Sequence, residues 1–133
     1  MSRSPQLARF IRRMNAIPVA VRAAVQPALD SSAAELVGTM KRLAPVEDGA
    51  LQRTIEAQPG KHELARQVVA GGEATTVPVR DGADAEYDYA LAQEFGTADM
   101  PANPFFFPAF RLLRKRLNNR IKRSIRKAVK DAL

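Results

Sequence analysis

The 133-residue chain lacks cysteine and tryptophan, contains a single histidine, and has only eight aromatic residues. Without cysteine it can form no disulfide bond, no thiol nucleophile and no thiolate metal site. One histidine is too few for a zinc site built from histidine and cysteine ligands. No apolar run approaches the ~20 residues needed to span a bilayer, so we expect neither a transmembrane segment nor a membrane partner.

What the chain does contain is typical of a folded domain. Hydrophobic residues make up 46% of it, too many for a disordered basic tail. The length suits one core, so we expect a single domain over residues 1–133. The first residues lead into an Arg-rich segment instead of an apolar one, so no secretory signal is predicted and an intracellular, soluble protein is expected.

The net charge of +7 is unevenly distributed along the chain. Residues 1–22 carry +5, residues 23–110 carry −7, and residues 111–133 carry +9. Basic ends usually indicate a polyanionic partner such as nucleic acid or an anionic membrane. Pairing of these ends with the acidic middle of the same chain, or of a neighbouring copy, explains the charge equally well. Both interpretations stay open at this point.

Apolar spacing predicts helices over residues 5–43. Steps of three and four residues indicate a short helix over 5–16, ended by Ile17 and Pro18, and a second, longer helix over 19–43. Pro27 predicts a kink, or a new helix start, inside the second helix. Pro45 ends the helical region because the residue before a proline disfavours helical backbone angles.

A small, mostly antiparallel sheet is predicted over residues 51–80. Residues 51–58 begin as a helical turn and pass into a strand, and residues 63–70 and 74–80 supply two further strands. Gly71-Gly72 between the last two strands indicates a hairpin. Pro78 places the final strand at an edge or a bulge, and residues 81–86 read as an exposed loop.

Two further helices complete the predicted α+β fold. A short helix over 87–95 is ended by Gly96. A long helix then runs from Phe105 or Pro108 to the end, with 108–133 as its expected span. Its apolar residues recur at three- and four-residue steps, and Arg and Lys fill most of the remaining face.

No sequence pattern supports a catalytic role for any of the candidate groups. His62 reads as a solvated loop residue. Glu47-Asp48, together with Asp81, Asp84, Glu86 and Asp88, sits in turns without a calcium-loop pattern and reads as solubilising charge. Gly71-Gly72 has no following Lys-Ser/Thr and no following helix, so it is a turn and not a phosphate loop. The sequence therefore predicts no enzyme, no cofactor and no metal site.

The C-terminal helix is the one segment suited to contact nucleic acid directly. It would make salt-dependent, sequence-independent contacts to phosphates, and nothing marks base readout. A membrane-surface helix is a weaker reading because Ala128 and Ala132 leave its far end weakly apolar. The candidate contacts to DNA or to another subunit are Arg114, Lys115, Arg120, Lys122, Arg123, Arg126 and Lys127.

Two stretches, LAPVEDGALQRTI (43–55) and YDYALAQEFGTADMPANPFFFPAF (87–110), carry a resemblance when taken in this order. Together they resemble the tail-completion, or head–tail joining, proteins of long-tailed double-stranded DNA bacteriophages. Asn103 stands where that family commonly has Arg, and Phe106-Phe107 replaces a Leu-Arg pair. The candidate motif and interface residues are Pro45, Gly49, Leu51, Tyr89, Glu94, Phe95, Gly96, Thr97, Met100, Pro101, Pro104, Phe105, Phe106, Phe107 and Pro108.

The resemblance implies a non-enzymatic virion protein, made in the host cytoplasm and assembled as a ring at the head–tail junction. Six copies are suspected, with the head connector or adaptor and the tail tube or tail terminator as partners, and DNA passing through the ring. The basic ends would then face that DNA or the acidic middles of adjacent copies, with residues 81–88 as one acidic candidate.

Two questions remain open from the residues. The cluster Phe105–Phe107 would be core in a lone domain, whereas in a ring at least one Phe would face a neighbour. The alternative function is a nonspecific DNA-binding protein that acts through the basic C-terminal helix.

Overall fold

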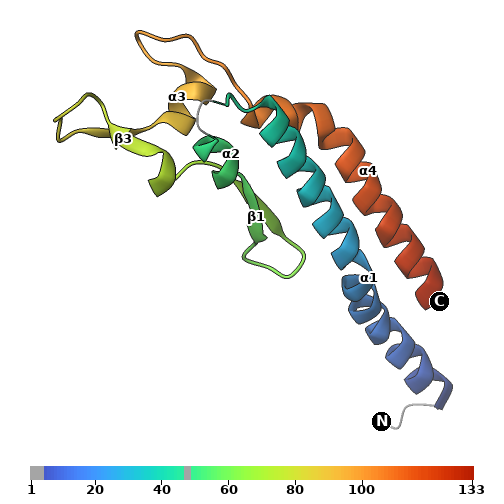
Figure 1. Ribbon diagram of the computed structural model, residues 1–133. Coiled ribbons are helices and arrows are strands. Elements are labelled where there is room, and N and C mark those ends of the chain that lie inside the picture. The colour runs from blue at the N-terminus through green and yellow to red at the C-terminus, as the bar shows by residue number, and fades with distance from the viewer. Residues whose placement is uncertain (1–4, 47–48) are drawn as a thin grey trace.

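The computed structural model describes residues 5–46 and 49–133, so the Glu47-Asp48 pair lies outside the described residues (Figure 1). It contains helices and two small antiparallel sheets, which confirms the predicted α+β class. The elements in chain order are α1 (Pro5–Leu43), α2 (Ala50–Thr54), β1 (Glu56–Pro59), β2 (Arg66–Val69), the 3-10 turn η1 (Glu73–Thr75), β3 (Thr76–Pro78), β4 (Glu86–Asp88), α3 (Tyr89–Phe95) and α4 (Phe106–Ala132).

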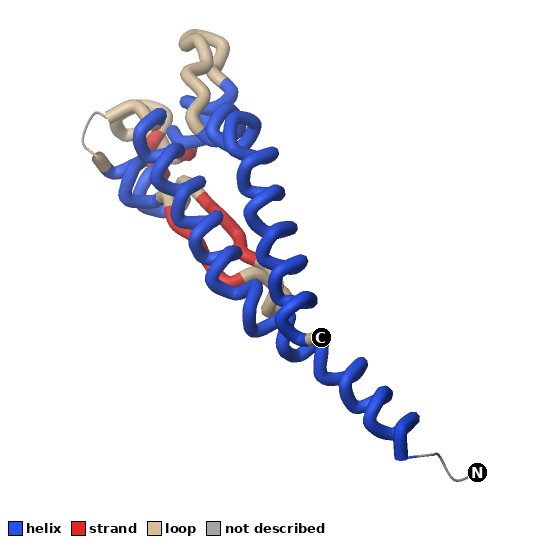
Figure 2. The backbone as a smooth tube through the Cα atoms, turned by 90° about the vertical axis from the view of Figure 1, so that its right-hand side faces the viewer, coloured by secondary structure: helices blue, strands red, loops and turns tan. Residues whose placement is uncertain are grey.

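The long helices α1 and α4 pack side by side and run in opposite directions (Figures 1 and 2). Most of the short elements between them gather at the end where α1 finishes and α4 begins, and the β1–β2 hairpin extends from there back along α1. We call this part, residues 49–105, the lobe. No helix in the described part of the chain is both long and apolar enough to cross a membrane.

Helix α1 is continuous through Pro18 and Pro27, so the predicted break at Pro18 is wrong. Each proline removes one backbone hydrogen bond and normally bends or ends a helix. Both proline side chains are exposed here, so the carbonyl that loses its partner is on the water-facing side. The predicted short helix and long helix are therefore one element of 39 residues.

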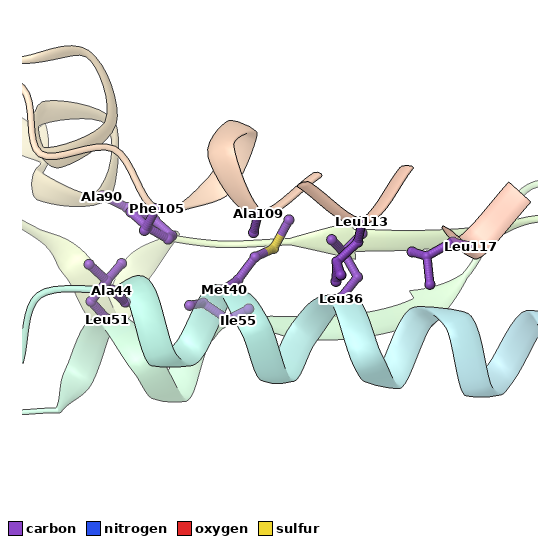
Figure 3. Packing of buried hydrophobic residues seen from close by; sticks show 10 residues of the cluster. All are labelled: Leu36, Met40, Ala44, Leu51, Ile55, Ala90, Phe105, Ala109, Leu113 and Leu117. Carbon is purple, nitrogen blue, oxygen red and sulfur yellow. The ribbon is translucent and has the colours of Figure 1, made fainter. Parts of the chain in front are cut away.

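The hydrophobic core lies between α1 and α4 and continues into the lobe. Leu36 and Met40 of α1 face Ala109 and Leu113 of α4 (Figure 3). Ala109 is completely buried, and its small side chain lets the two helices approach closely. Leu51, Ile55, Ala90 and Phe105 extend the same cluster into the lobe.

The strands form two separate two-stranded sheets instead of one. β1 pairs with β2, with Glu56 opposite Val69 and Pro59 opposite Arg66. β3 pairs with β4, from Thr76 opposite Asp88 to Pro78 opposite Glu86. The second sheet therefore ends at Asp88, beyond the predicted limit at residue 80.

The predicted hairpin around Gly71-Gly72 is wrong, because contacts with distant side chains redirect the chain there. The Gly71 amide donates to Thr54 Oγ1 at 2.9 Å, and the Gly72 amide donates to Asp88 Oδ2 at 2.9 Å. The Gly72 carbonyl then accepts the Thr75 amide at 3.2 Å. The chain thus turns into η1, and β3 does not return along β2.

The β1–β2 hairpin is tied to α1 by charged side chains. Arg66 Nε donates to Asp30 Oδ1 at 2.6 Å, and its Nη2 also bonds Gln26. Arg22 pairs with Glu63 at 3.3 Å near the turn of the hairpin. The first sheet is therefore anchored on α1 along its length.

Both later helices begin within two residues of their predicted starts. α3 begins at Tyr89 instead of residue 87, because Tyr87 and Asp88 belong to β4. α4 begins at Phe106, two residues before Pro108 and one residue after the alternative predicted start at Phe105. Pro108 is tolerated in the first turn because the first amides of a helix have no intrahelical partner.

Candidate functional site

The two sequence stretches that carry the resemblance meet in the lobe. Pro45 and Leu51, from the first stretch, line a hollow of about 340 Å³ together with Tyr89 and Met100 from the second. Gly49 adopts a left-handed conformation (φ 80°) directly before α2. Residues 38 or more positions apart in the sequence thus form one region of the surface.

Glu94 connects α3 to α4. Its side chain is buried, and its carboxylate accepts the amides of Phe105 at 2.8 Å, Phe106 at 2.9 Å and Phe107 at 2.9 Å. These amides form the N-terminal end of α4, where donors lack intrahelical partners and the helix dipole favours negative charge. Glu94 therefore fixes where α4 begins and how it is oriented against α3.

The loop from Gly96 to Pro104 is tightly folded. Gly96 has φ 77°, and a Cβ there would lie 2.8 Å from the Ala102 amide nitrogen, so only glycine fits without displacement of the loop. The Thr97 amide donates to the Met100 carbonyl at 2.9 Å. Pro101 and Pro104 are exposed and restrict the backbone on the way to α4.

The phenylalanines divide between core and surface. Phe105 is 1% exposed and belongs to the core, whereas Phe107 is 44% exposed and Phe95 is 65% exposed. Phe106 is half-buried between them and contacts both of its neighbours edge-on. Phe105 thus belongs to the core, as predicted for a lone domain. Phe107 is exposed, and that a Phe faces a neighbouring copy stays a prediction.

An exposed apolar surface joins α3 to the first turn of α4. We call Leu91, Phe95 and Phe107 the apolar patch. The Phe95 and Phe107 rings lie 6.1 Å apart, and Leu91 is 61% exposed one helical turn before Phe95. Beside them is a hollow of about 310 Å³ whose other walls include residues 68–70 of β2 and its end. Exposed clusters of large apolar side chains mark interaction surfaces.

The sequence reading missed Leu91 and residues 68–70. For Leu91 a signal existed, because it stands four residues before Phe95 in a predicted helix, and such pairs share a face. For residues 68–70 there was none, because their position beside α3 depends on the path of the chain after β2.

Asp88 is structural, so the prediction that it serves only as solubilising charge is wrong. Its Oδ1 accepts the Ala90 amide at 2.9 Å, which caps α3, and the Thr75 hydroxyl at 2.6 Å. Asp81, Asp84 and Glu86 are exposed. Only these three members of the 81–88 segment therefore present charge outward. His62 is exposed, and its Nδ1 accepts the Leu64 amide at 3.0 Å.

Most of the basic candidates on α4 either pair with α1 or line an open hollow. Arg120 pairs with Glu35 of α1, and Arg116 Nε lies 3.1 Å from the same carboxylate. Part of the positive charge is thus met by the acidic middle of the same chain. The outer group, Lys115, Lys122, Arg123 and Arg126, lines an open hollow of about 580 Å³ along α4.

The two remaining basic candidates lie elsewhere. Arg114 borders a hollow of about 200 Å³ between α1, β2 and α4, and Lys127 is exposed. In the part of the chain that the structure describes, no group of three His, Cys, Asp or Glu side chains is placed to hold a metal ion. The arrangement offers surfaces for contact with other macromolecules.

Comparison with known protein families gives a match over most of the chain. The family model described as "Bacteriophage HK97-gp10, putative tail-component" matches residues 8–96. The match runs from α1 to the glycine that follows α3, and it leaves the loop and α4 outside. No curated protein and no solved structure matches the chain significantly.

Proposed function

Because the chain belongs to the HK97-gp10-like family of bacteriophage tail components, we propose that it joins the tail to the head connector as one subunit of a ring. A tail component is a structural part of the virion and assembles with other virion proteins. The proposal adds the position at the head-proximal end of the tail, a closed ring of six copies, and DNA passing through its centre. It assigns no catalytic role.

The apolar patch is the observation that carries the proposal. Leu91, Phe95 and Phe107 expose large apolar side chains at one end of an elongated molecule (Figure 1). Covering such a surface is favourable at about 25 cal/mol per Å² of apolar area. A patch at one end that meets a different surface of the next copy is a heterologous contact, and such contacts close into rings.

In this proposal the outer basic residues of α4 line the channel. Lys115, Lys122, Arg123 and Arg126 lie on one open side of the helix. Contacts to phosphate would be weakened by salt and independent of DNA sequence, which suits a duplex that must pass through. Glu35 already holds Arg116 and Arg120, so these two contribute less.

The test is the mass of the full chain in solution, measured by light scattering at low and high salt, with and without a DNA duplex. We expect a closed oligomer with the same number of copies whether or not DNA is present. Leu91→Ser in the patch should reduce the mass to that of a monomer. Leu112→Ser is the matched control, because Leu112 is 71% exposed on α4 outside the patch, and it should leave the mass unchanged.

A persistent monomer that binds DNA tightly at low salt would overturn the ring and favour the second candidate function. That function is nonspecific DNA binding through α4, which the open basic hollow favours. In that case, Lys122→Ala with Arg126→Ala would weaken DNA binding and reduce the slope of affinity against salt by about two.

A further inference from the structure

Helix α1 is much longer than the helix it packs against. α1 has 39 residues and α4 has 27, which at 1.5 Å per residue correspond to about 58 Å and about 40 Å. The last part of α1 and the first part of α4 lie together at the lobe, so the first part of α1 extends beyond the C-terminal end of α4 (Figures 1 and 2). We call residues 5–21 the N-terminal arm.

The arm projects from the body of the molecule, but its sequence is that of a packed helix. No described side chain of α1 before Val25 is buried. Leu7, Ile11 and Val21 nevertheless continue the apolar face to which the buried Val25 belongs, at helical spacing. Isolated helices of this length are only marginally stable in water. A surface that covers the apolar face would therefore stabilise the arm.

The arm and the lobe carry opposite charge. Asp30 is the first acidic residue of the chain, so every charged side chain of the arm is an arginine. Residues 49–105 of the lobe contain four basic and nine acidic residues. The turn of the β1–β2 hairpin reaches α1 at Arg22, just after the arm, but α3 and the start of α4, which carry the apolar patch, lie at the other end of α1 (Figure 1). The arm therefore lies far from the apolar patch of its own copy, and its positive charge complements the acidic surplus around the patch of another copy.

We propose that the N-terminal arm of one copy docks on the apolar patch of the next copy. The apolar face of the arm would cover Leu91, Phe95 and Phe107 and fill the hollow beside them, and its arginines would meet the acidic surplus of that lobe. The contact is heterologous, so repetition around an axis yields a ring when the rotation closes. The inference rests on the proposed function, which requires that copies associate, and it names the two surfaces that join them.

The absence of cysteine makes the contact directly testable with the full chain. Leu7→Cys is prepared on one sample and Leu91→Cys on another, and the two are mixed and oxidised. We expect a disulfide-linked dimer containing one of each variant, at least tenfold above the yield for the control mixture. The control mixes Leu7→Cys with Asn119→Cys, which places an exposed cysteine on α4 away from the lobe.

Charge reversal tests the electrostatic part of the contact. Arg9→Glu with Arg12→Glu should weaken association at least tenfold in sedimentation experiments. Lys127→Glu with Lys130→Glu changes the net charge by the same amount at exposed positions on α4, outside the arm and the lobe. This control should associate as the parent chain does.

The outcomes separate this inference from the proposed function. An intact oligomer without the arm-to-patch crosslink would overturn the inference and leave the ring in place. A chain that is monomeric at every concentration and gives no crosslink would overturn both. Equal weakening by the two charge-reversal pairs would also overturn the inference, because net charge and not the arm would then control association.

Discussion

The two ends of the α1–α4 pair are built in opposite ways. At the lobe end, Phe105 is buried, Glu94 satisfies three amides of α4, and Met40 packs beneath them. At the other end, α4 stops and α1 continues, and those of its apolar side chains that the structure describes there are at least partly exposed. The same helix is thus core at one end and surface at the other. The difference indicates that stability is concentrated near the lobe, whereas the arm contributes little to folding.

The largest expected effect is at Phe105. Phe105→Ala removes a side chain that is 1% exposed and should lower the free energy of unfolding by about 3–5 kcal/mol. That is a large share of the roughly 5–15 kcal/mol typical of a domain. Urea unfolding followed by circular dichroism measures it. Phe107→Ala, at 44% exposure, should cost less than about 1 kcal/mol. Equal losses would mean that the two residues are packed alike.

Removal of the Glu94 carboxylate should have the next largest effect. Glu94→Ala leaves the amides of Phe105, Phe106 and Phe107 without their acceptor, and we expect a loss of about 2–3 kcal/mol. The same urea titration applies. Glu73→Ala removes an equal charge from an exposed position of the lobe and should leave the midpoint almost unchanged. A Glu94 variant as stable as the parent would show that water replaces the cap.

Substitution of two valines of α1 shows how much its packed part and its arm each contribute to stability. Val25 is 4% exposed and Val19 is 67% exposed. Val25→Ala should cost about 1.5 kcal/mol, because two buried methyl groups are lost at about 0.8 kcal/mol each. Val19→Ala should change the unfolding free energy by less than about 0.5 kcal/mol. Thermal and urea unfolding of dilute protein distinguish them, and a comparable loss at Val19 would refute the division of α1.

The smallest expected effect lies between the two ends, at Glu35. Glu35→Gln weakens its pairs with Arg116, which is 67% exposed, and with Arg120, which is 24% exposed, so we expect a loss of about 1 kcal/mol. At about 1 M salt, where charges are screened beyond about 3 Å, the difference from the parent should shrink. A loss that is independent of salt would assign Glu35 a packing role instead.

Local patterns were sufficient to predict much of the fold. The apolar spacing in residues 19–43 and in the C-terminal stretch indicated the two long helices, because a buried stripe must recur at helical period. The break at Pro18 could not be judged from the sequence, since a proline is tolerated in a helix when its unpaired carbonyl faces water. The strand pairing also escaped prediction, because it depends on hydrogen bonds from Gly71 to Thr54 and from Gly72 to Asp88. These partners are 17 and 16 residues away in the sequence.

The sequence predicted which residues belong to the candidate site but not what each of them does there. The resemblance singled out Glu94, Phe95 and Phe105–Phe107, but which of them are buried depends on how α3 meets α4. The Glu94 cap could not be foreseen because its three amides lie 11 to 13 residues further along the chain. Asp88, which stands directly before a predicted helix, did carry an N-cap signal.

The apolar patch is shared between two helices, and this determines which subunits can assemble. Leu91 and Phe95 come from α3 and Phe107 comes from α4, so the three side chains gather only when Glu94 holds the helices together. A misfolded or half-folded chain displays no such surface. If the patch is the site where copies join, assembly proofreads folding, because only correctly folded subunits can enter a growing particle.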